Sequence, residues 1–262
     1  MHGLLLVTLT AFIAGVVNAV AGGGTFLTFP ALTGFAGLDQ KIANMVSTVG
    51  LWPGSAASVV AARADFVRIP RGMLLTFAII SLVGGGIGSW LLIVSSNRSF
   101  ELVIPWLLAF ATCIFGFSKP IARWAGRQHG HRTMGWTTFV AVIQLFVAIY
   151  GGYFGAGIGV LMLAGLSFAG LDDLNQMNAM KVLLATLING IAAGIFLFSG
   201  TLVWSLVIAM AIASTIGGFL GMFAARRVKP QYLRAVILAV GIMLTVVYFT
   251  KNYAFLFHRG HV

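Results

Sequence analysis

Ten apolar segments joined by short polar loops constrain this chain more than any other feature of its sequence. They cover residues 3–21, 25–38, 42–62, 72–95, 102–118, 134–154, 158–170, 175–198, 202–225 and 233–257. A helix of about 20 apolar residues crosses the hydrocarbon core of a membrane, and only the second and seventh segments are clearly too short. The 262 residues are 60% hydrophobic and 8% charged, too few charges for a soluble domain. We therefore predict an all-α integral membrane protein that is multi-pass in the cell membrane and surrounded by lipid. If each of the two short segments is counted together with the segment before it, the chain has eight hydrophobic segments, which is the usual count.

Glycine clusters interrupt the apolar sequence twice. Gly22, Gly23 and Gly24 separate the first two segments, and the stretch from Gly151 to Gly159 separates the sixth and seventh. Glycine costs a helix interior about 1 kcal/mol relative to alanine, so each cluster should break its helix. Unbroken, residues 3–38 would form a helix of roughly 54 Å, well beyond the ~30 Å hydrocarbon core. Each broken pair is therefore either a steeply bent crossing or a hairpin that enters the membrane and returns.

The basic loops favour the hairpin. Eleven of the sixteen Lys and Arg residues fall in three loops, as Arg63, Arg68 and Arg71, then Lys119, Arg123, Arg127 and Arg132, then Arg226, Arg227, Lys229 and Arg234. The positive-inside rule places all three loops in the cytoplasm. Because the second and third loops lie on the same side, the chain must cross the membrane an even number of times between them. Two full spans already lie there, so the broken pair must return to the side from which it entered.

This count predicts a definite topology. Residues 1–2, 39–41, 96–101, 199–201 and the C-terminus should be extracytoplasmic. Loops 63–71, 119–132, 170–175 and 226–234 should be cytoplasmic. The formal net charge is +11, but its concentration in these loops is typical of a membrane protein and predicts no nucleic-acid partner.

The two halves of the chain are related in sequence. A single ungapped shift of 133 positions superimposes Gly22 on Gly155, Gly24 on Gly157 and Ser81 on Ser214. We predict two inverted-topology repeats, residues 1–125 and 133–262, with 119–132 as a cytoplasmic linker. Each repeat is a re-entrant, glycine-broken helical hairpin followed by three transmembrane helices. Inverted repeats of this kind are typical of alternating-access carriers.

The tips of the two hairpins suggest an anion site. The second arms begin near Thr25 and Ile158, so their N-termini should point toward the middle of the membrane from opposite sides. A helix N-terminus has free N–H groups and carries roughly +0.5 charge, and it binds anions well. The alternative is that the glycines only allow helices to pack closely.

Lys181 is the only charged residue well inside an apolar segment. A lysine within the membrane is by default a candidate functional residue, because burying its charge in lipid is costly. The repeat pairs it with Thr48. Two alternatives remain, because Lys181 could reach the cytoplasmic surface or pair with Asp172 or Asp173. For Asn18 and Tyr153 the alternative is an ordinary interhelical hydrogen bond. The candidate substrate-binding residues are Asn18, Gly22, Gly23, Gly24, Thr25, Asn44, Ser47, Thr48, Gly151, Gly152, Tyr153, Gly155, Gly157, Asn178, Lys181 and Asn189.

Catalytic and metal sites have no support in the sequence. All five carboxylates and all five histidines lie in loops, at helix ends or near the termini, which leaves no proton relay at depth. There is no metal-ligand cluster, no nucleophile with a base and no phosphate-binding loop. We expect no enzyme activity, no metal and no cofactor. Cys113, the only cysteine, is expected to be a buried core thiol.

The glycine motifs resemble those of a known family. The stretch from Ala21 to Leu32 (AGGGTFLTFPAL) is followed by Asn44 and by Trp52-Pro53-Gly54-Ser55. The second half has GGYFGAGIGVLML from Gly151, then MNAMKVLL from Met177 and Ile188-Asn189-Gly190. Over nearly the whole chain this resembles the TauE/SafE family of sulfite-exporter-like permeases. The resemblance implies a bacterial inner-membrane protein that exports or takes up sulfite, or small sulfonated or carboxylated anions.

The sequence as a whole thus predicts a secondary transporter of small anions, with sulfite or small organosulfur anions such as sulfonates as substrate. Its mechanism would be alternating access around a central site formed by the two hairpins. Two alternatives stay open. One is an anion channel with the same site, and the other is a non-transport membrane subunit or intramembrane enzyme that binds a lipid or redox partner. The sequence is also compatible with a homodimer.

Overall fold

The computed structural model describes residues 2–67, 69–126, 134–169, 171, 173–225, 227 and 230–257, and every element in these ranges is helical. The helices are α1 (His2–Val20), α2 (Thr25–Gly34), α3 (Gln40–Ala61), the 3-10 helix η1 (Arg63–Phe66), α4 (Arg71–Val94), α5 (Asn97–Gly126), α6 (Met134–Tyr153), α7 (Ile158–Phe168), α8 (Leu174–Leu197), α9 (Trp204–Ala225) and α10 (Pro230–Phe257). The all-α prediction is confirmed, and the helices follow the ten apolar segments closely.

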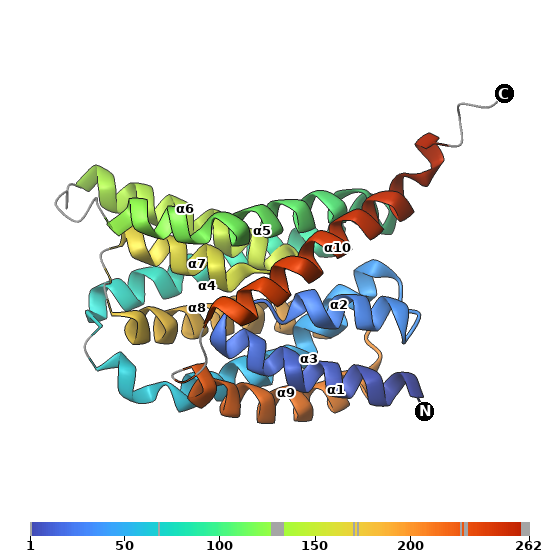
Figure 1. Cartoon of the computed structure of the whole chain (residues 1–262), viewed down its shortest axis with the longest axis horizontal. Helices are drawn as coiled ribbons and strands as arrows, with labels where there is room; N and C mark the ends of the chain where they lie inside the picture. Colours follow the sequence, from blue (N-terminus) through green and yellow to red (C-terminus); the bar gives the residue numbers. More distant parts are fainter. Residues whose placement is uncertain are drawn as a thin grey trace.

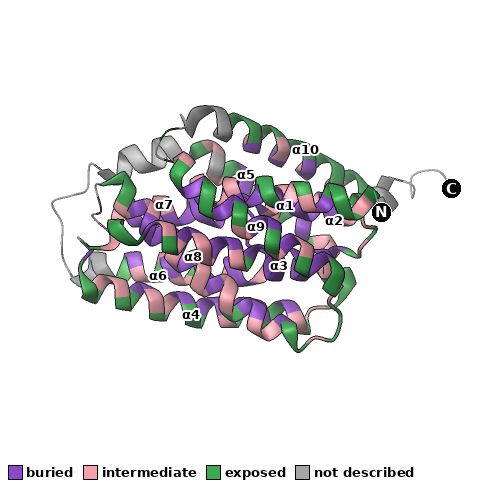
Figure 2. Ribbon diagram, turned by 90° about the horizontal axis from the view of Figure 1, so that it is seen from below, coloured by how far each residue is buried: buried purple, intermediate pink, exposed green. Residues whose placement is uncertain are grey.

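The length and composition of these helices fit a membrane. Among the described residues, α1, α4, α8, α9 and residues 235–253 of α10 form five helices long and apolar enough to cross one. Their outer faces expose large apolar side chains such as Ile79, which is 60% exposed. Figure 2 shows buried residues where helices face one another and exposed ones along the outside. Lipid rather than water suits such a surface, so the chain is a multi-pass membrane protein.

The structure corrects two predictions about helix α5. Helix α5 runs to Gly126, past the predicted end at residue 118, so part of the predicted linker is helical; residues 127–132 lie outside the described residues. Charged residues mark where the hydrocarbon ends, but they do not stop a helix. Cys113 is exposed on α5 rather than buried, because an apolar residue of a membrane helix can face lipid instead of the core.

Each broken pair is a hairpin. A Cβ on Gly3 would stand 2.7 Å from the carbonyl oxygen of Phe35, so α2 ends beside the start of α1. In the second half, the rings of Phe139 and Phe168 lie 6.5 Å apart, so α7 ends near the start of α6. Figure 1 shows that the two hairpins enter from opposite ends of the molecule. We call these ends the α1 end and the α6 end, after the helix that begins there.

Helix contacts recur in the two halves. Helix α1 packs on α9 as α6 packs on α4, and α3 packs on α9 as α8 packs on α4. Helices α3 and α8 pack on each other at the centre, and α5 packs on α10. Several of these contacts need glycine. A Cβ on Gly217 would overlap the carbonyl of Phe12, and a Cβ on Gly88 would overlap the carbonyl of Ile149. For Gly217 and Gly88, close packing is therefore the role that the structure supports.

The loops gather at the two ends as the charge pattern predicts. The turns after α2, α4 and α8 lie at the α1 end, and η1 lies at the α6 end (Figure 1). Val67, after η1, is 84% exposed, and Phe198, after α8, is 92% exposed. In a Cys113→Ser background, Val67→Cys and Phe198→Cys should react with an impermeant thiol reagent from opposite faces of the membrane, Val67→Cys from the cytoplasm. Reaction of both from one face would contradict the topology.

Candidate substrate site

The two glycine breaks meet at the centre of the molecule. The N–H of Gly159 donates to the carbonyl of Gly22 at 3.3 Å, and a Cβ on Gly22 would overlap the Cα of Gly159. Gly22 and Gly155, which the repeat pairs, have φ of 76° and 78°, the left-handed region that favours glycine. Glycine at position 22 therefore both turns the chain and lets the second hairpin touch the first.

A cavity lies beside this contact and collects predicted residues from both halves. Six of its lining residues were predicted as substrate-binding, namely Asn18, Gly22, Thr25, Gly155, Lys181 and Asn189. Ser55 and Ser58 also line it, and sequence reasoning missed them. The cavity has a volume of about 20 Å³, enough for a single water-sized molecule. A larger substrate requires the walls to move apart.

Lys181 is buried in the cavity wall and bound to helix α1. Its side chain is 1% exposed, and Nζ donates to the carbonyls of Asn18, Ala19 and Val20 at 3.3, 3.0 and 3.3 Å. These are the last three carbonyls of α1, which a helix leaves without internal partners. A cation at a helix C-terminus is also favoured by the helix dipole.

Both alternatives for Lys181 fail on this geometry as far as the structure describes them. Burial excludes a side chain that reaches the surface. Asp173 accepts instead from the N–H groups of Asn175 and Gln176 at 2.7 and 3.3 Å, as the N-cap of α8. Asp172 lies outside the described residues.

The charge of the site depends on Lys181. Each hairpin tip brings together the C-terminus of its first helix and the N-terminus of its second, whose partial charges are roughly equal and opposite. The dipoles of one hairpin therefore largely offset each other. Lys181 is the single ionisable side chain among the residues that line the cavity. The two helix N-termini, predicted to add positive charge beside Lys181, are thus largely offset by the two C-termini next to them.

Thr25 and Asn189 offer hydrogen bonds to a ligand. Within the described part of the chain, the hydroxyl of Thr25 and the amide of Asn189 have no hydrogen-bond partner, and both residues line the cavity. Asn18 is different, because its Oδ1 accepts from the N–H of Gly24 at 2.8 Å and fixes the hairpin turn. Ser58 donates to carbonyls of Gly54 and Gly218. The polar groups left over for a ligand are therefore mainly those of Thr25 and Asn189.

Ten predicted residues do not line the cavity. They are Gly23, Gly24, Asn44, Ser47, Thr48, Gly151, Gly152, Tyr153, Gly157 and Asn178. Asn44 Nδ2 donates to the carbonyl of Tyr153 at 3.0 Å, so a residue of α3 caps the end of α6 much as Lys181 of α8 caps the end of α1. Thr48 donates to the carbonyl of Asn44. Asn44 therefore supports the second hairpin, and Ser47 contacts the first hairpin through the hydroxyl of Thr28.

The sequence of the chain is similar to those of known membrane proteins. The sequence model of the sulfite exporter family TauE/SafE matches residues 7–248. The chain belongs to the TauE/SafE family. The TauE/SafE chain is 26% identical to a probable membrane transporter protein, ORF9, of Sinorhizobium sp, over 94% of this chain and 92% of that protein. It is 23% identical to a probable membrane transporter protein of Haemophilus influenzae, over 92% of each chain. No solved structure matches it. This TauE/SafE protein is a membrane transporter.

Proposed function

We propose that this TauE/SafE protein is a secondary carrier of small anions, with sulfite or a small organosulfur anion such as a sulfonate as its substrate. The observation that carries the proposal is the cavity at the hairpin tips. Predicted residues from both halves line it, and its one ionisable side chain is the buried cation Lys181. A buried cation beside neutral donors suits an anion, because the attraction between opposite charges is stronger in a low-dielectric site than in water.

Alternating access between two inverted repeats is the proposed mechanism. It is supported by hairpins that enter from opposite ends and by helix contacts that recur in the two halves. The cavity lies where the two hairpins touch, so rocking one half against the other would change its exposure to each end. A monoanion that leaves a negative-inside compartment gains about 2.3 kcal/mol per 100 mV, which is sufficient to drive export without a coupled ion.

Transport by the purified protein tests the proposal. Thermal shift should first rank sulfite, methanesulfonate and acetate against the neutral control dimethyl sulfone, and the anions should stabilise the protein. Liposomes that contain only this protein should then show saturable uptake of the best ligand and counterflow against a trapped pool. Flux that neither saturates nor shows counterflow would favour the channel, and stabilisation by none of the anions would contradict the proposal. Flux without any added partner excludes a non-transport subunit.

A further inference from the structure

The space between the cavity and the α1 end is filled with aromatic rings. Five residues form this aromatic cluster, namely Phe29, Phe100, Tyr153, Phe154 and Tyr248. The rings of Phe29 and Phe154 lie 5.6 Å apart, those of Phe29 and Tyr248 5.2 Å, and those of Phe100 and Tyr153 5.7 Å. Phe29, Phe100 and Phe154 are at most 1% exposed. The cluster reaches from the hairpin tips to the α4–α5 turn, where the hydroxyls of Tyr153 and Ser95 are 3.4 Å apart.

Toward the α6 end the cavity lies close to the helix termini, because Ser58 is three residues before the end of α3 and Lys181 is seven residues after the start of α8. A separate buried cluster there consists of Ala19, Ala62, Ala179, Val182 and Met222. Val182 of this cluster also lines the cavity, so the two are adjacent. Repeat symmetry alone would predict equal packing at the two ends. The structure instead has its cavity nearer the α6 end and the aromatic cluster toward the α1 end.

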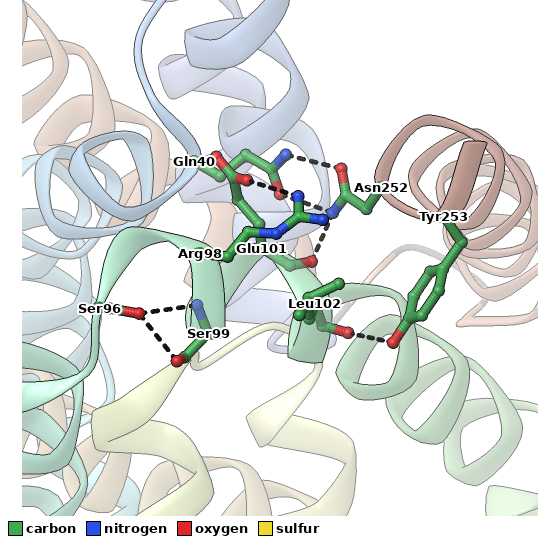
Figure 3. Close-up of polar contacts among 8 residues, drawn as sticks. All are labelled: Gln40, Ser96, Arg98, Ser99, Glu101, Leu102, Asn252 and Tyr253. Atoms are coloured by element: carbon green, nitrogen blue, oxygen red, sulfur yellow. Dashed lines mark hydrogen bonds and ion pairs between the residues drawn. The ribbon is translucent and has the colours of Figure 1, made fainter. Parts of the chain in front are cut away.

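A polar pair fastens the α1 end beyond the aromatic cluster. Gln40, the first residue of α3, and Asn252 of α10 exchange two amide hydrogen bonds of 3.0 and 3.1 Å (Figure 3). They are 5% and 6% exposed. Asn252 also donates to the carbonyl of Glu101 at the start of α5. This Gln40–Asn252 pair therefore joins α3, α5 and α10 at one point.

We propose that the Gln40–Asn252 pair and the aromatic cluster form the gate that closes the substrate cavity at the α1 end, leaving the α6 end as the side from which the cavity is reached in this state. Opening the α1 end requires α10 to move away from α3, and that breaks both buried amide bonds. A buried amide left without its partner is costly, so the pair resists this movement. The inference rests on the transport function and not on the identity of the anion.

Site-directed labelling tests the gate without any substrate. In the Cys113→Ser background, Ser55→Cys places a thiol on the cavity wall, and a small impermeant methanethiosulfonate reports its exposure. Ser55→Cys should react from the same membrane face as Val67→Cys, at the α6 end, and not from the face of Phe198→Cys. Adding Gln40→Leu and Asn252→Leu should raise reaction from the Phe198 face at least fivefold. Reaction of Ser55→Cys from the Phe198 face without these changes, or from neither face, would overturn the proposal, as would no increase in a folded double variant.

Two further variants complete the experiment. Thr250→Val on α10 is the matched control, because the Thr250 hydroxyl bonds only to carbonyls of its own helix, and it should leave labelling unchanged. Gln40→Cys with Asn252→Cys, joined by a short bis-methanethiosulfonate cross-linker, should stop transport, and reduction of the cross-link should restore it. Transport that continues in the cross-linked protein would overturn the gate. If labelling behaves as expected but sulfite and sulfonates do not move, the gate stands and the proposed substrate fails.

Discussion

Lys181→Met is expected to lower anion transport at limiting substrate at least tenfold. The ammonium supplies the positive charge of the cavity, because the helix dipoles at each hairpin tip offset each other. A charge-assisted contact contributes a few kcal/mol, and 1.4 kcal/mol corresponds to a factor of ten. Methionine keeps the apolar stem and removes the charge. Uptake of the anion by proteoliposomes at concentrations far below KM is the measurement.

The structure adds a second effect that the experiment must separate. In Lys181→Met the last three carbonyls of α1 lose their donor, which costs about 1–3 kcal/mol for each buried group left unpaired. Thermal stability should therefore fall together with transport. Lys181→Arg keeps the charge and the donors, and it should retain part of both, although its wider fork fits less well.

Thr48→Val is the matched control from the other repeat. The Thr48 hydroxyl bonds to the carbonyl of Asn44 on its own helix, and it does not line the cavity. Its loss should cost transport much less than the loss of the Lys181 ammonium. Wild-type uptake kinetics in a folded Lys181→Met protein would refute the counter-charge role and leave Lys181 as a helix cap alone.

Local chemistry explains why much of the fold could be predicted. The glycine runs at 22–24 and 151–159 break helices by their intrinsic cost, and the charged loops mark the ends of spans. These signals lie within a few residues of the feature they predict. Most helix bounds, the two hairpins and the cavity residues at the hairpin tips followed from them, although α5 extends beyond its apolar segment.

Long-range contacts explain what could not be predicted. Lys181 bonds to Asn18, 163 positions away, and nothing near Lys181 in the sequence indicates that a helix C-terminus lies beside it. Ser55 belongs to the Trp52-Pro53-Gly54-Ser55 motif, but neither it nor Ser58 was expected to line a cavity, because a serine in a helix commonly bonds to a carbonyl of its own preceding turn, as both do here. The Gln40–Asn252 pair joins residues 212 positions apart, and it could not be predicted from the sequence around either residue.

Gly22→Ala is expected to abolish transport and to lower the melting temperature more than any other glycine substitution at the hairpin tips. At φ of 76° an alanine costs about 1–2 kcal/mol, and its Cβ would overlap the Cα of Gly159. That neighbour is backbone, so relief requires the two hairpins to separate, and forced overpacking typically costs a further ~1–3 kcal/mol. Thermal unfolding of the purified protein and uptake by proteoliposomes measure the two effects.

Gly34→Ala, in the same hairpin, is the matched control for Gly22→Ala. Gly34 is the last residue of α2, it has no positive φ, and a Cβ there would meet nothing within 4 Å. Alanine should leave transport unchanged and stabilise the helix by up to about 1 kcal/mol. Gly23→Ala should be mild, because its Cβ would meet a flexible side chain, that of Ile237, at 3.3 Å. If Gly22→Ala has the transport rate and the melting temperature of Gly34→Ala, the contact between the hairpins is not required for transport. That result would contradict the proposal that the cavity beside this contact is the substrate site.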